Sequence, residues 1–381
     1  MRLHLYGGFG EKGRTCVGVE ANGYRLLLDA GVNTSARGPG YYPAISAEEL
    51  RATDALVITH AHEDHVAALG WCVAGGFRGR LLMTRETAHE ADQFLDAYAD
   101  VAHRRAARDF AREVLAVDSP VTLGPLQLVA GRSGHVAGGV WCAVGDGRRT
   151  LVYCSDVVPA SPVFAMDPMP RCDAIVLDAS YGDDDVPAQD RAQAVRDWVL
   201  ARPQGCILPT PLSGRSAELL AIVPGPVALC EGMREALQAQ MADPAWLAGA
   251  SAERLAQRLA RASDWQRGSP LPRAALVCHD GMGIAGPSRE ILAIAAAQGH
   301  PVLFTGHLPA DSPGEHMHAA GQAAWLRLPT HPTLAENIAI AAASVAATVI
   351  GHSCDHATLK RLQRHIPLLR AEVATGDRLE V

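Results

Sequence analysis

A short segment with three histidines and one aspartate follows an apolar run near the start of the chain. The segment is Thr59-His60-Ala61-His62-Glu63-Asp64-His65, and the apolar run at residues 55–58 predicts a buried β-strand. Because side chains alternate along an extended chain, His60 and His62 point to one side. Imidazole and carboxylate are the groups that Zn²⁺ binds where no thiolate is offered. The segment therefore predicts a metal site, and a polar surface loop is the less favoured interpretation.

A turn at Glu63 would let Asp64 and His65 face a second point close to the first. Further along the chain, single histidines and aspartates follow apolar runs that predict strands. They are His135 in the glycine-rich loop between strands expected at 120–130 and 140–145, Asp156 after 151–154, Asp178 after 174–177, and His352 after 347–350. His331 precedes an alanine-rich helix. Taken singly, each of these residues is more often structural than a ligand.

The composition is that of an ordinary globular protein. The chain has 381 residues, of which 48% are hydrophobic and 20% are charged, enough for two domains or for one domain with an insertion. We find no apolar run long enough for a membrane span and no signal peptide, so we expect no membrane contact. Nine dispersed cysteines without a Cys-x-x-Cys pair predict reduced thiols and a cytoplasmic location.

The formal net charge is −7, which does not suit a protein that coats nucleic acid. It does not exclude a nuclease, because bound metal adds positive charge at the active site. We expect one long helix from Thr84 to about Leu115, with Arg104, Arg108 and Arg112 on one face. A solvated face is favoured over a phosphate-binding stripe. Likewise, Tyr41-Tyr42 are expected to pack their loop rather than to stack on bases.

The motif at residues 59–65 resembles the signature of the metallo-β-lactamase superfamily of metal-dependent hydrolases. The opening from Leu5 to Gly31, with its Gly-Gly-x-Gly-Glu turn and its strand ending in Asp-x-Gly, is similar to that of RNase J-type nucleases. The segment Asp178-Ala179-Ser180-Tyr181-Gly182 resembles motif A of the β-CASP group, which includes RNase J and cleavage-and-polyadenylation nucleases. His331 and His352 resemble motifs B and C of that group.

This resemblance implies an α/β fold, a metallo-β-lactamase αββα sandwich with an inserted α/β β-CASP domain. Residues 1–182 would form the first part of the sandwich, residues 183–325 the insertion, and residues 326–381 the C-terminal part of the sandwich. The insertion is expected to be a lid over the metals. One departure from the family occurs at residues 306–315, where His307 and acidic residues replace an expected basic residue.

The resemblance also implies two Zn²⁺ ions, with Mn²⁺ as an alternative. The expected ligands are His60, His62 and His135 on the first ion, Asp64, His65 and His352 on the second, and Asp156 between the two. In such centres the ions lie about 3.5–4 Å apart and hold a hydroxide that attacks phosphorus.

The expected catalytic residues are Asp64, His331 and Asp178. His331 would protonate the leaving oxygen as a general acid, and Asp178 would orient it. Ser213, Gly214 and Arg215 stand at a glycine turn that opens a helix. Free backbone N–H groups and the guanidinium there are expected to bind a substrate phosphate.

The expected function is hydrolysis of RNA, with single-stranded DNA as a further substrate. RNA is favoured because of the RNase J-like opening and the histidine in motif C. Two alternatives stay open, namely hydrolysis of a small ester, lactam or phosphodiester, and a non-catalytic β-CASP subunit that binds RNA or a partner. A homodimer, or a partner nuclease or RNA-binding subunit, would suit a bare catalytic core.

Overall fold

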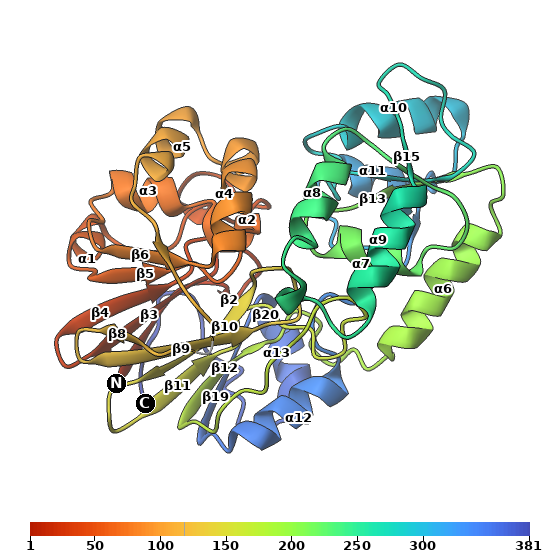
Figure 1. Ribbon diagram of the computed structural model, residues 1–381. Helices are drawn as coiled ribbons and strands as arrows, with labels where there is room; N and C mark the ends of the chain where they lie inside the picture. The colour runs from red at the N-terminus through yellow and green to blue at the C-terminus, as the bar shows by residue number, and fades with distance from the viewer. Residues whose placement is uncertain (118) are drawn as a thin grey trace.

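The computed structural model describes residues 1–117 and 119–381 and shows two lobes side by side (Figure 1). The larger lobe holds both chain termini, because β1 (Arg2–Gly7) pairs with β21 (Arg378–Glu380) in antiparallel fashion. The second lobe is built from the middle of the chain. The cleft described below is lined by residues of both lobes.

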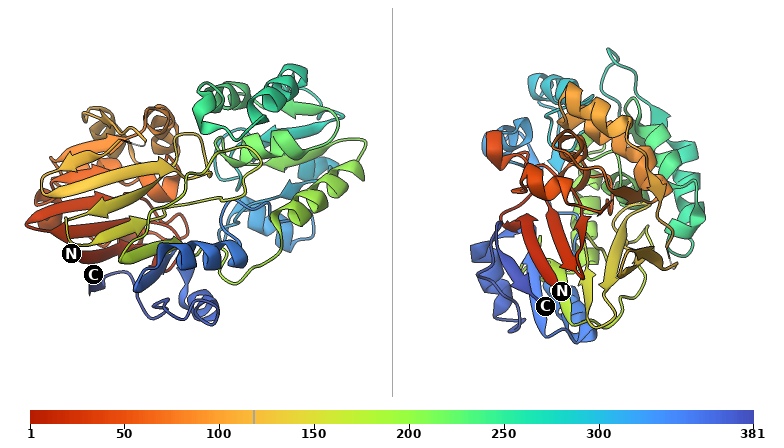
Figure 2. Two further views of the ribbon diagram at one scale, coloured as in Figure 1. Left: turned by 60° about the horizontal axis from the view of Figure 1, so that its bottom comes forward. Right: turned by 90° about the vertical axis from the view of Figure 1, so that its left-hand side faces the viewer.

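The larger lobe contains two sheets that face each other (Figure 2). The first has the order β21-β1-β3-β4-β5-β6-β7 and the second the order β19-β12-β11-β10-β9-β8. The remaining strands of the first sheet are β3 (Cys16–Ala21), β4 (Tyr24–Leu28), β5 (Ala55–Val57), β6 (Arg80–Met83) and β7 (Glu113–Val114). Those of the second are β8 (Val121–Leu123), β9 (Leu126–Arg132), β10 (Val140–Gly145), β11 (Thr150–Tyr153), β12 (Ala174–Asp178) and β19 (Thr348–His352).

Alternation along the strands decides which side chains fill which layer. Leu26 and Leu28 belong to the core between the sheets, whereas Leu27 belongs to the core beneath the helices of the first sheet. In the second sheet, Val176 points to the core between the sheets and Ile175 to the outer core. Strands that are buried on both faces read as continuous apolar runs, which is what the sequence shows at these positions.

Helices cover the outer face of each sheet. Those on the first sheet are α1 (Ala47–Arg51), α2 (Glu63–Val66), α3 (Leu69–Ala74), α4 (Arg85–Tyr98) and α5 (Val101–Arg108), and those on the second are α12 (Leu334–Ser344) and α13 (His356–Gln363). The layers therefore run helix, sheet, sheet, helix, which confirms the predicted αββα sandwich. Within the described parts of the chain, every helix is too short or too polar to cross a membrane.

The second lobe has a sheet of its own, with the order β13-β16-β14-β15 and parallel pairing throughout. Its strands are β13 (Cys206–Pro209), β14 (Val227–Leu229), β15 (Ser263–Asp264) and β16 (Ala275–Cys278). A short parallel pair, β17 (Leu303–Phe304) and β18 (Ala324–Trp325), lies after it. The helices of this lobe are α6 (Ala188–Leu200), α7 (Arg215–Ile222), α8 (Met233–Gln240), α9 (Ser251–Arg261), α10 (Ser288–Gln298) and α11 (Pro313–Ala319).

The second lobe interrupts the second sheet between two neighbouring strands. β12 and β19 are parallel partners, and Asp178 is paired in register with His352 although 174 positions separate them. The chain leaves the sandwich after β12 and returns before β19. Two residues that are remote in sequence therefore end side by side at one edge of the sheet.

The single helix expected from Thr84 to about Leu115 is wrong. The chain is extended at Ala99, and the Asp100 side chain accepts a hydrogen bond from the His103 N–H, so a new helix begins there. Aspartate is more stable at such an N-cap than inside a helix, so the chain begins a new helix at this point instead of continuing the first one. The arginines pair with acids of α4, since Arg108 contacts Asp96 at 2.7 Å and Arg112 contacts Asp92 at 2.7 Å. They form the expected polar surface rather than a stripe of free positive charge.

The glycine-rich loop at residues 7–13 is more than the tight hairpin predicted between the first strands. Its β2 (Phe9–Gly10) pairs with β20 (Cys354–Asp355), which directly follows the segment containing His352. The loop therefore ties the N-terminus to the edge of the second sheet. The tyrosine pair packs as expected, since the Tyr42 ring stacks on Trp71 with centroids 4.9 Å apart.

Gly31 is required because its backbone lies directly against the peptide between Asp64 and His65. A β-carbon at Gly31 would lie 1.7 Å from the backbone oxygen of Asp64. We expect Gly31→Ala to lower the free energy of unfolding by about 1–3 kcal/mol or more, as overpacking does. Chemical denaturation measures this loss. Gly145→Ala is the matched control, because its β-carbon would meet nothing closer than 3.8 Å; equal stability of the two variants would contradict the packing argument.

Candidate metal centre

The candidate ligands lie on loops that leave the two facing sheets at one edge. His60 and His62 follow β5 of the first sheet. His135 lies between β9 and β10, and Asp156 follows β11, both in the second sheet. Because β11, β12 and β19 are parallel, their C-terminal ends lie at the same edge. The fold therefore brings side chains from both sheets to one place.

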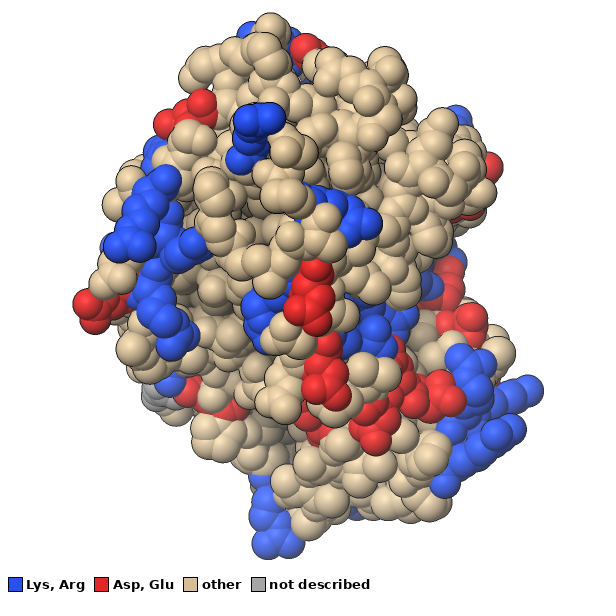
Figure 3. Space-filling view, turned by 90° about the vertical axis from the view of Figure 1, so that its right-hand side faces the viewer, with Lys and Arg blue, Asp and Glu red and all other residues tan. Residues whose placement is uncertain are grey.

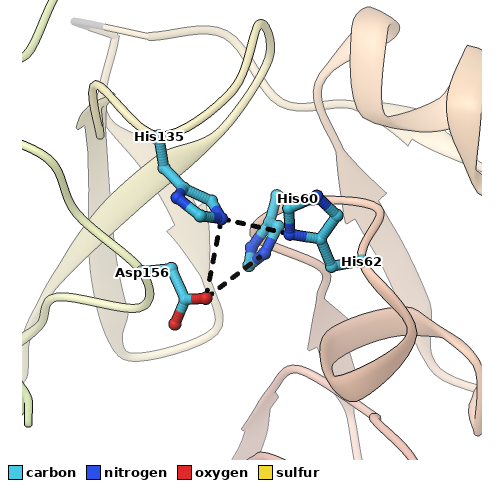
Figure 4. Close-up of side chains that lie close together, drawn as sticks. All are labelled: His60, His62, His135 and Asp156. Atoms are coloured by element: carbon cyan, nitrogen blue, oxygen red, sulfur yellow. Dashed lines mark hydrogen bonds and ion pairs between the residues drawn. The ribbon is translucent and has the colours of Figure 1, made fainter. Parts of the chain in front are cut away.

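Four of these residues form a compact group, shown in Figure 4. The potential ligand atoms of His60, His62, His135 and Asp156 all lie within 4.8 Å of one another. His135 Nε2 is 3.1 Å from His62 Nδ1 and 3.6 Å from Asp156 Oδ2. His60 Nε2 lies 3.8 Å from the same carboxylate oxygen. The structure thus brings together the three histidines that the sequence assigned to one ion, with Asp156 beside them.

A second group consists of Asp156, Asp178 and His352, whose ligand atoms also lie within 4.8 Å of one another. Asp156 is common to both groups, as a bridging carboxylate must be. This grouping differs from the sequence-based assignment, which gave Asp178 no place on a metal. The register of β12 with β19 is the reason, because it sets Asp178 beside His352.

Asp64 and His65 lie at the edge of this arrangement. His65 Nε2 is 3.3 Å from Asp156 Oδ1, and Asp64 Oδ1 is 3.9 Å from His65 Nε2. Both residues belong to α2, a single turn of helix that follows directly on His62. They approach Asp156 from the side of the first sheet, and the His65 ring lies 6.4 Å from the His352 ring between centroids.

Several polar atoms at the centre are buried without a hydrogen bond, namely Nε2 of His60, His62 and His65 and Oδ1 of Asp156. A buried polar atom without a partner is costly, and a cluster of them calls for an explanation such as an ion. Burial lowers the pKa of His62 to about 4 and holds the pKa values of His60 and His135 well below the ordinary value for histidine. Neutral imidazoles with free nitrogens are the form that binds metal. The residues present therefore fit a divalent cation.

Hydrogen bonds on the outer side of the rings set the tautomers. His135 Nδ1 lies 2.8 Å from the Thr330 carbonyl and His65 Nδ1 lies 2.8 Å from Asp29 Oδ2. Only a protonated nitrogen can donate to such acceptors, so Nε2 of the neutral His135 ring carries the lone pair that faces the centre. Metal-binding histidines are commonly oriented in this way. Burial would lower the pKa of His65, but Asp156, Asp29 and Asp64 outweigh it and hold that pKa well above the ordinary value.

Asp29 is a residue whose role the sequence did not reveal. Its carboxylate is fully buried between the sheets. It accepts hydrogen bonds from the Thr59 N–H at 2.7 Å, from the Tyr153 hydroxyl at 2.7 Å and from His65. The available signal was the strand ending in Asp29-Ala30-Gly31. Its donors come from segments that only the fold brings together.

His331 and Asp178 form a buried pair beside the second group. His331 Nδ1 lies 2.8 Å from Asp178 Oδ2 and 3.8 Å from Asp156 Oδ2. Burial by itself would lower the pKa of His331, but Asp178 and Asp156 outweigh it and raise that pKa to about 9. His331 is therefore an imidazolium at neutral pH, unlike the histidines of the first group.

Thr330 joins several of these elements, which the sequence did not indicate either. Its carbonyl accepts from His135, and its N–H donates to the Tyr181 hydroxyl at 3.1 Å. Its own hydroxyl accepts from Arg215 Nη2 at 2.6 Å. This buried threonine, the residue directly before His331, thus connects the candidate ligand His135 with Tyr181 and with the second lobe.

A cleft of about 1180 Å³ opens above the centre and is lined by residues of both lobes. His62, His135, Asp156 and His331 lie on its surface, and so does Arg215. On the face of the molecule shown in Figure 3, basic side chains gather at the left and acidic side chains lie in a band below the centre, with basic side chains beside them.

Of the three residues expected to bind substrate, only Arg215 keeps groups free to do so. The Gly214 N–H donates to Gln240 Oε1 at 2.8 Å, and the Ser213 hydroxyl donates to buried Glu90 at 3.0 Å. The expectation of a free N–H at Gly214 is therefore wrong, because Gln240 at the end of α8 in the same lobe already accepts from it. The Arg215 Nε is buried without a hydrogen bond. Among the described residues, no carboxylate forms an ion pair with Arg215.

Several of the candidate ligands lie in a segment that matches a known protein family. The family described as the β-lactamase superfamily domain matches residues 24–208. The match covers slightly less than half of the chain, and these residues are similar to a β-lactamase superfamily domain. The match includes His60, His62, His135, Asp156 and Asp178, and it ends at β13.

Two similar proteins match a little more than half of the chain. Transcription termination factor FttA of Methanococcus maripaludis is 27% identical over 248 residues, which are 58% of this chain and 39% of that protein. Ribonuclease TTHA0252 of Thermus thermophilus is 26% identical over 238 residues, covering 58% of this chain and 54% of that protein. Together with the family match, these similarities confirm the resemblance found in the sequence. The chain spans only about two fifths to one half of their length.

A crystal structure of a protein of unknown function from Enterococcus faecalis V583 superposes over 99% of both chains. The TM-score is 0.63 at 12% sequence identity. This likeness shows that the fold of both lobes together occurs in a solved structure, and it carries no information about activity.

Replacing two histidines of the first group tests whether it binds metal. We expect His60→Ala/His62→Ala to lose one bound ion per chain, because two of its nitrogen donors are removed, while the fold persists. Elemental analysis of the purified protein measures metal content, and circular dichroism checks the fold. His89→Ala/His365→Ala removes two exposed histidines as the control. Unchanged metal content in the first variant would refute the assignment.

Proposed function

We propose that this protein is a metal-dependent phosphodiesterase that cleaves RNA, with single-stranded DNA as a further substrate. The observation that carries the proposal is the convergence of unsatisfied buried nitrogens on Asp156, at the floor of a cleft that also holds Arg215. The similarity to one protein named a ribonuclease and another named a transcription termination factor supports a nucleic-acid substrate.

The proposed ligands of the first ion are His60, His62 and His135. Asp64, His65 and His352 are the proposed ligands of the second, with Asp156 shared, and the position of Asp178 makes it a further candidate for that ion. Zn²⁺, or Mn²⁺ in its place, would neutralise charge on the phosphoryl oxygens and acidify water. Asp29 would set the orientation of His65.

His331 is the proposed general acid. Its Nδ1–H donates to Asp178, so Asp178 fixes the ring and the second proton is held at Nε2. The negative charge of Asp178 and Asp156 keeps the ring protonated. A proton held at Nε2 on the surface of the cleft is available to the leaving oxygen of a phosphodiester. Asp64, Asp178 and His331 remain the proposed catalytic residues.

Arg215 is the proposed contact to a substrate phosphate next to the one that is cleaved. Its Nη2 holds Thr330, while its Nε lacks a partner. A guanidinium with no paired carboxylate is a strong donor to phosphate. Ser213 and Gly214 would act by positioning this arginine through Glu90 and Gln240.

In this proposal, residues 183–325 are the inserted domain and form one wall of the cleft. The proposal also places the protein in the cytoplasm, since all nine cysteines are free. Because the chain spans part of its relatives' length, partners such as a second copy or an RNA-binding subunit belong to the proposal as well.

Hydrolysis of a small ester, lactam or phosphodiester is the second candidate, and one observation favours it. Glu63 and Asp280 both lie in the cleft, and burial together with Asp64 and Asp280 raises the pKa of Glu63 to about 8. Glu63 is therefore uncharged at neutral pH, and the carboxylates of Asp64 and Asp280 are the acidic groups of this wall that oppose a highly anionic substrate. Turnover of a small ester or lactam without cleavage of RNA would select this candidate.

End-labelled RNA tests the proposed function directly. We expect the metal-loaded protein to cleave single-stranded RNA, and we expect His331→Ala to lose about 10²–10⁴-fold in kcat, because proton transfer to the leaving group is removed. The variant should keep its metal, which elemental analysis measures. If its metal content falls as far as that of His352→Ala, the two histidines have been assigned the wrong roles.

Replacement of Arg215 separates phosphate binding from the chemical step. Arg215→Ala removes a charge-assisted hydrogen bond, so kcat/KM should fall by about 10- to 100-fold more on RNA than on bis-p-nitrophenyl phosphate. Arg254→Ala is the matched control, because Arg254 is an exposed arginine of α9. The same loss on both substrates would mean that Arg215 supports the fold rather than a phosphate.

A further inference from the structure

A row of flat side chains runs along the wall of the cleft away from His331. The Tyr181 ring meets the His331 ring edge to face, with centroids 5.0 Å apart. The guanidinium carbon of Arg327 lies 4.4 Å from the centre of the Tyr181 ring and 5.5 Å from that of Trp325. All four side chains line the cleft. The row therefore leads from the proposed acid to a tryptophan on the second lobe.

The members of this row are held in place by contacts outside it. Trp325 Nε1 donates to the Gly306 carbonyl at 2.8 Å. Arg327 pairs with Asp184 at 2.5 Å, and Asp184 also accepts from Arg191. The charge of Arg327 is thus neutralised within the protein. Its guanidinium serves as a flat spacer between two rings, and it is not the group that is free to bind a phosphate.

His307 adds a second flat group at the end of the row. It follows Gly306, whose carbonyl holds the Trp325 ring, and it lines the same cleft. Desolvation lowers the pKa of His307 to about 3, and the positive charges of Lys12 and Arg215 act in the same direction. The imidazole of His307 is exposed on the cleft wall, and the residue before it is hydrogen-bonded to the indole of Trp325, which lines the same cleft.

We propose that Trp325 and His307 form a stacking subsite for a nucleobase of single-stranded RNA, beside the scissile phosphate. The inference rests on the proposed function and extends it to the recognition of substrate. Because the row begins at His331, which would protonate the leaving 3′-oxygen, the base belongs to the nucleotide that carries this oxygen. Aromatic side chains next to cationic groups are the usual means of binding single strands, since every base has a π-face. In a duplex the base faces are already covered by neighbouring pairs.

Binding of a fluorescently labelled, cleavage-resistant phosphorothioate RNA tests the subsite by anisotropy. We expect Trp325→Leu to raise Kd by about 10- to 100-fold, the range for loss of one stacked base, and Trp325→Phe to raise it less. Trp198→Leu is the matched control, because Trp198 is a half-buried tryptophan outside the cleft with Arg202 over its ring at 3.6 Å. Its Kd should equal that of the unmodified protein.

The same backbone with every base removed isolates the contact to the base. It should bind the unmodified protein as weakly as the intact RNA binds Trp325→Leu, and the substitution should weaken its binding no further. Equal effects of Trp325→Leu on both ligands, or equal Kd values for Trp325→Leu and Trp198→Leu, would overturn the proposal. Failure of the proposed function has a different signature, namely tryptophan-dependent binding without cleavage of ordinary RNA by the unmodified protein.

Discussion

The rest of the structure depends on the contacts between the buried carboxylate of Asp156 and the histidines around it. Burial would raise its pKa, but His65 and His331 oppose this and hold the pKa well below its ordinary value. His60, His65, His135 and His331 each place a ring nitrogen within 3.3–3.8 Å of it. A charge buried at this depth is costly unless it is compensated. Elements of both sheets must therefore be in place for this carboxylate to be stable.

Each of the two sheets supplies a different part of the group of side chains around Asp156. The first sheet supplies His60, His62 and His65 through one loop and one helical turn, and Asp29 holds that turn from between the sheets. The second supplies Asp156 and Asp178 at the ends of parallel strands. Burial keeps the first group of histidines neutral, whereas acidic neighbours keep His331 charged. One carboxylate-rich centre thus holds imidazoles in two protonation states, which are the states that metal binding and proton donation require.

The second lobe completes the site through hydrogen bonds that cross between the lobes. Ser213 donates to Glu90, Ser161 donates to Glu218, and Arg215 holds Thr330. Burial raises the pKa of both glutamates to about 7, so these links are made by carboxyl groups that are easily neutralised. The turn at Gly214 also lies against the loop of His135, since a β-carbon there would meet Val136 at 2.7 Å. The wall of the cleft and the candidate ligands are therefore one packed unit.

Much of this arrangement could be predicted from the sequence, because it depends on local pattern. The apolar runs before His60, Asp156, Asp178 and His352 are strands and strand ends in the structure. The αββα sandwich was implied by the family resemblance that these motifs carry. The prediction of one continuous helix beyond Thr84 is wrong because Asp100 caps the start of a second helix. The preferences of single residues do not show whether such a cap or a continuous helix is the more stable. Only the tertiary structure placed Asp178 beside His352, engaged the Gly214 N–H with Gln240, and surrounded Asp29 with its donors. Strand register and contacts between lobes join residues that are far apart in sequence, so no local pattern contains them.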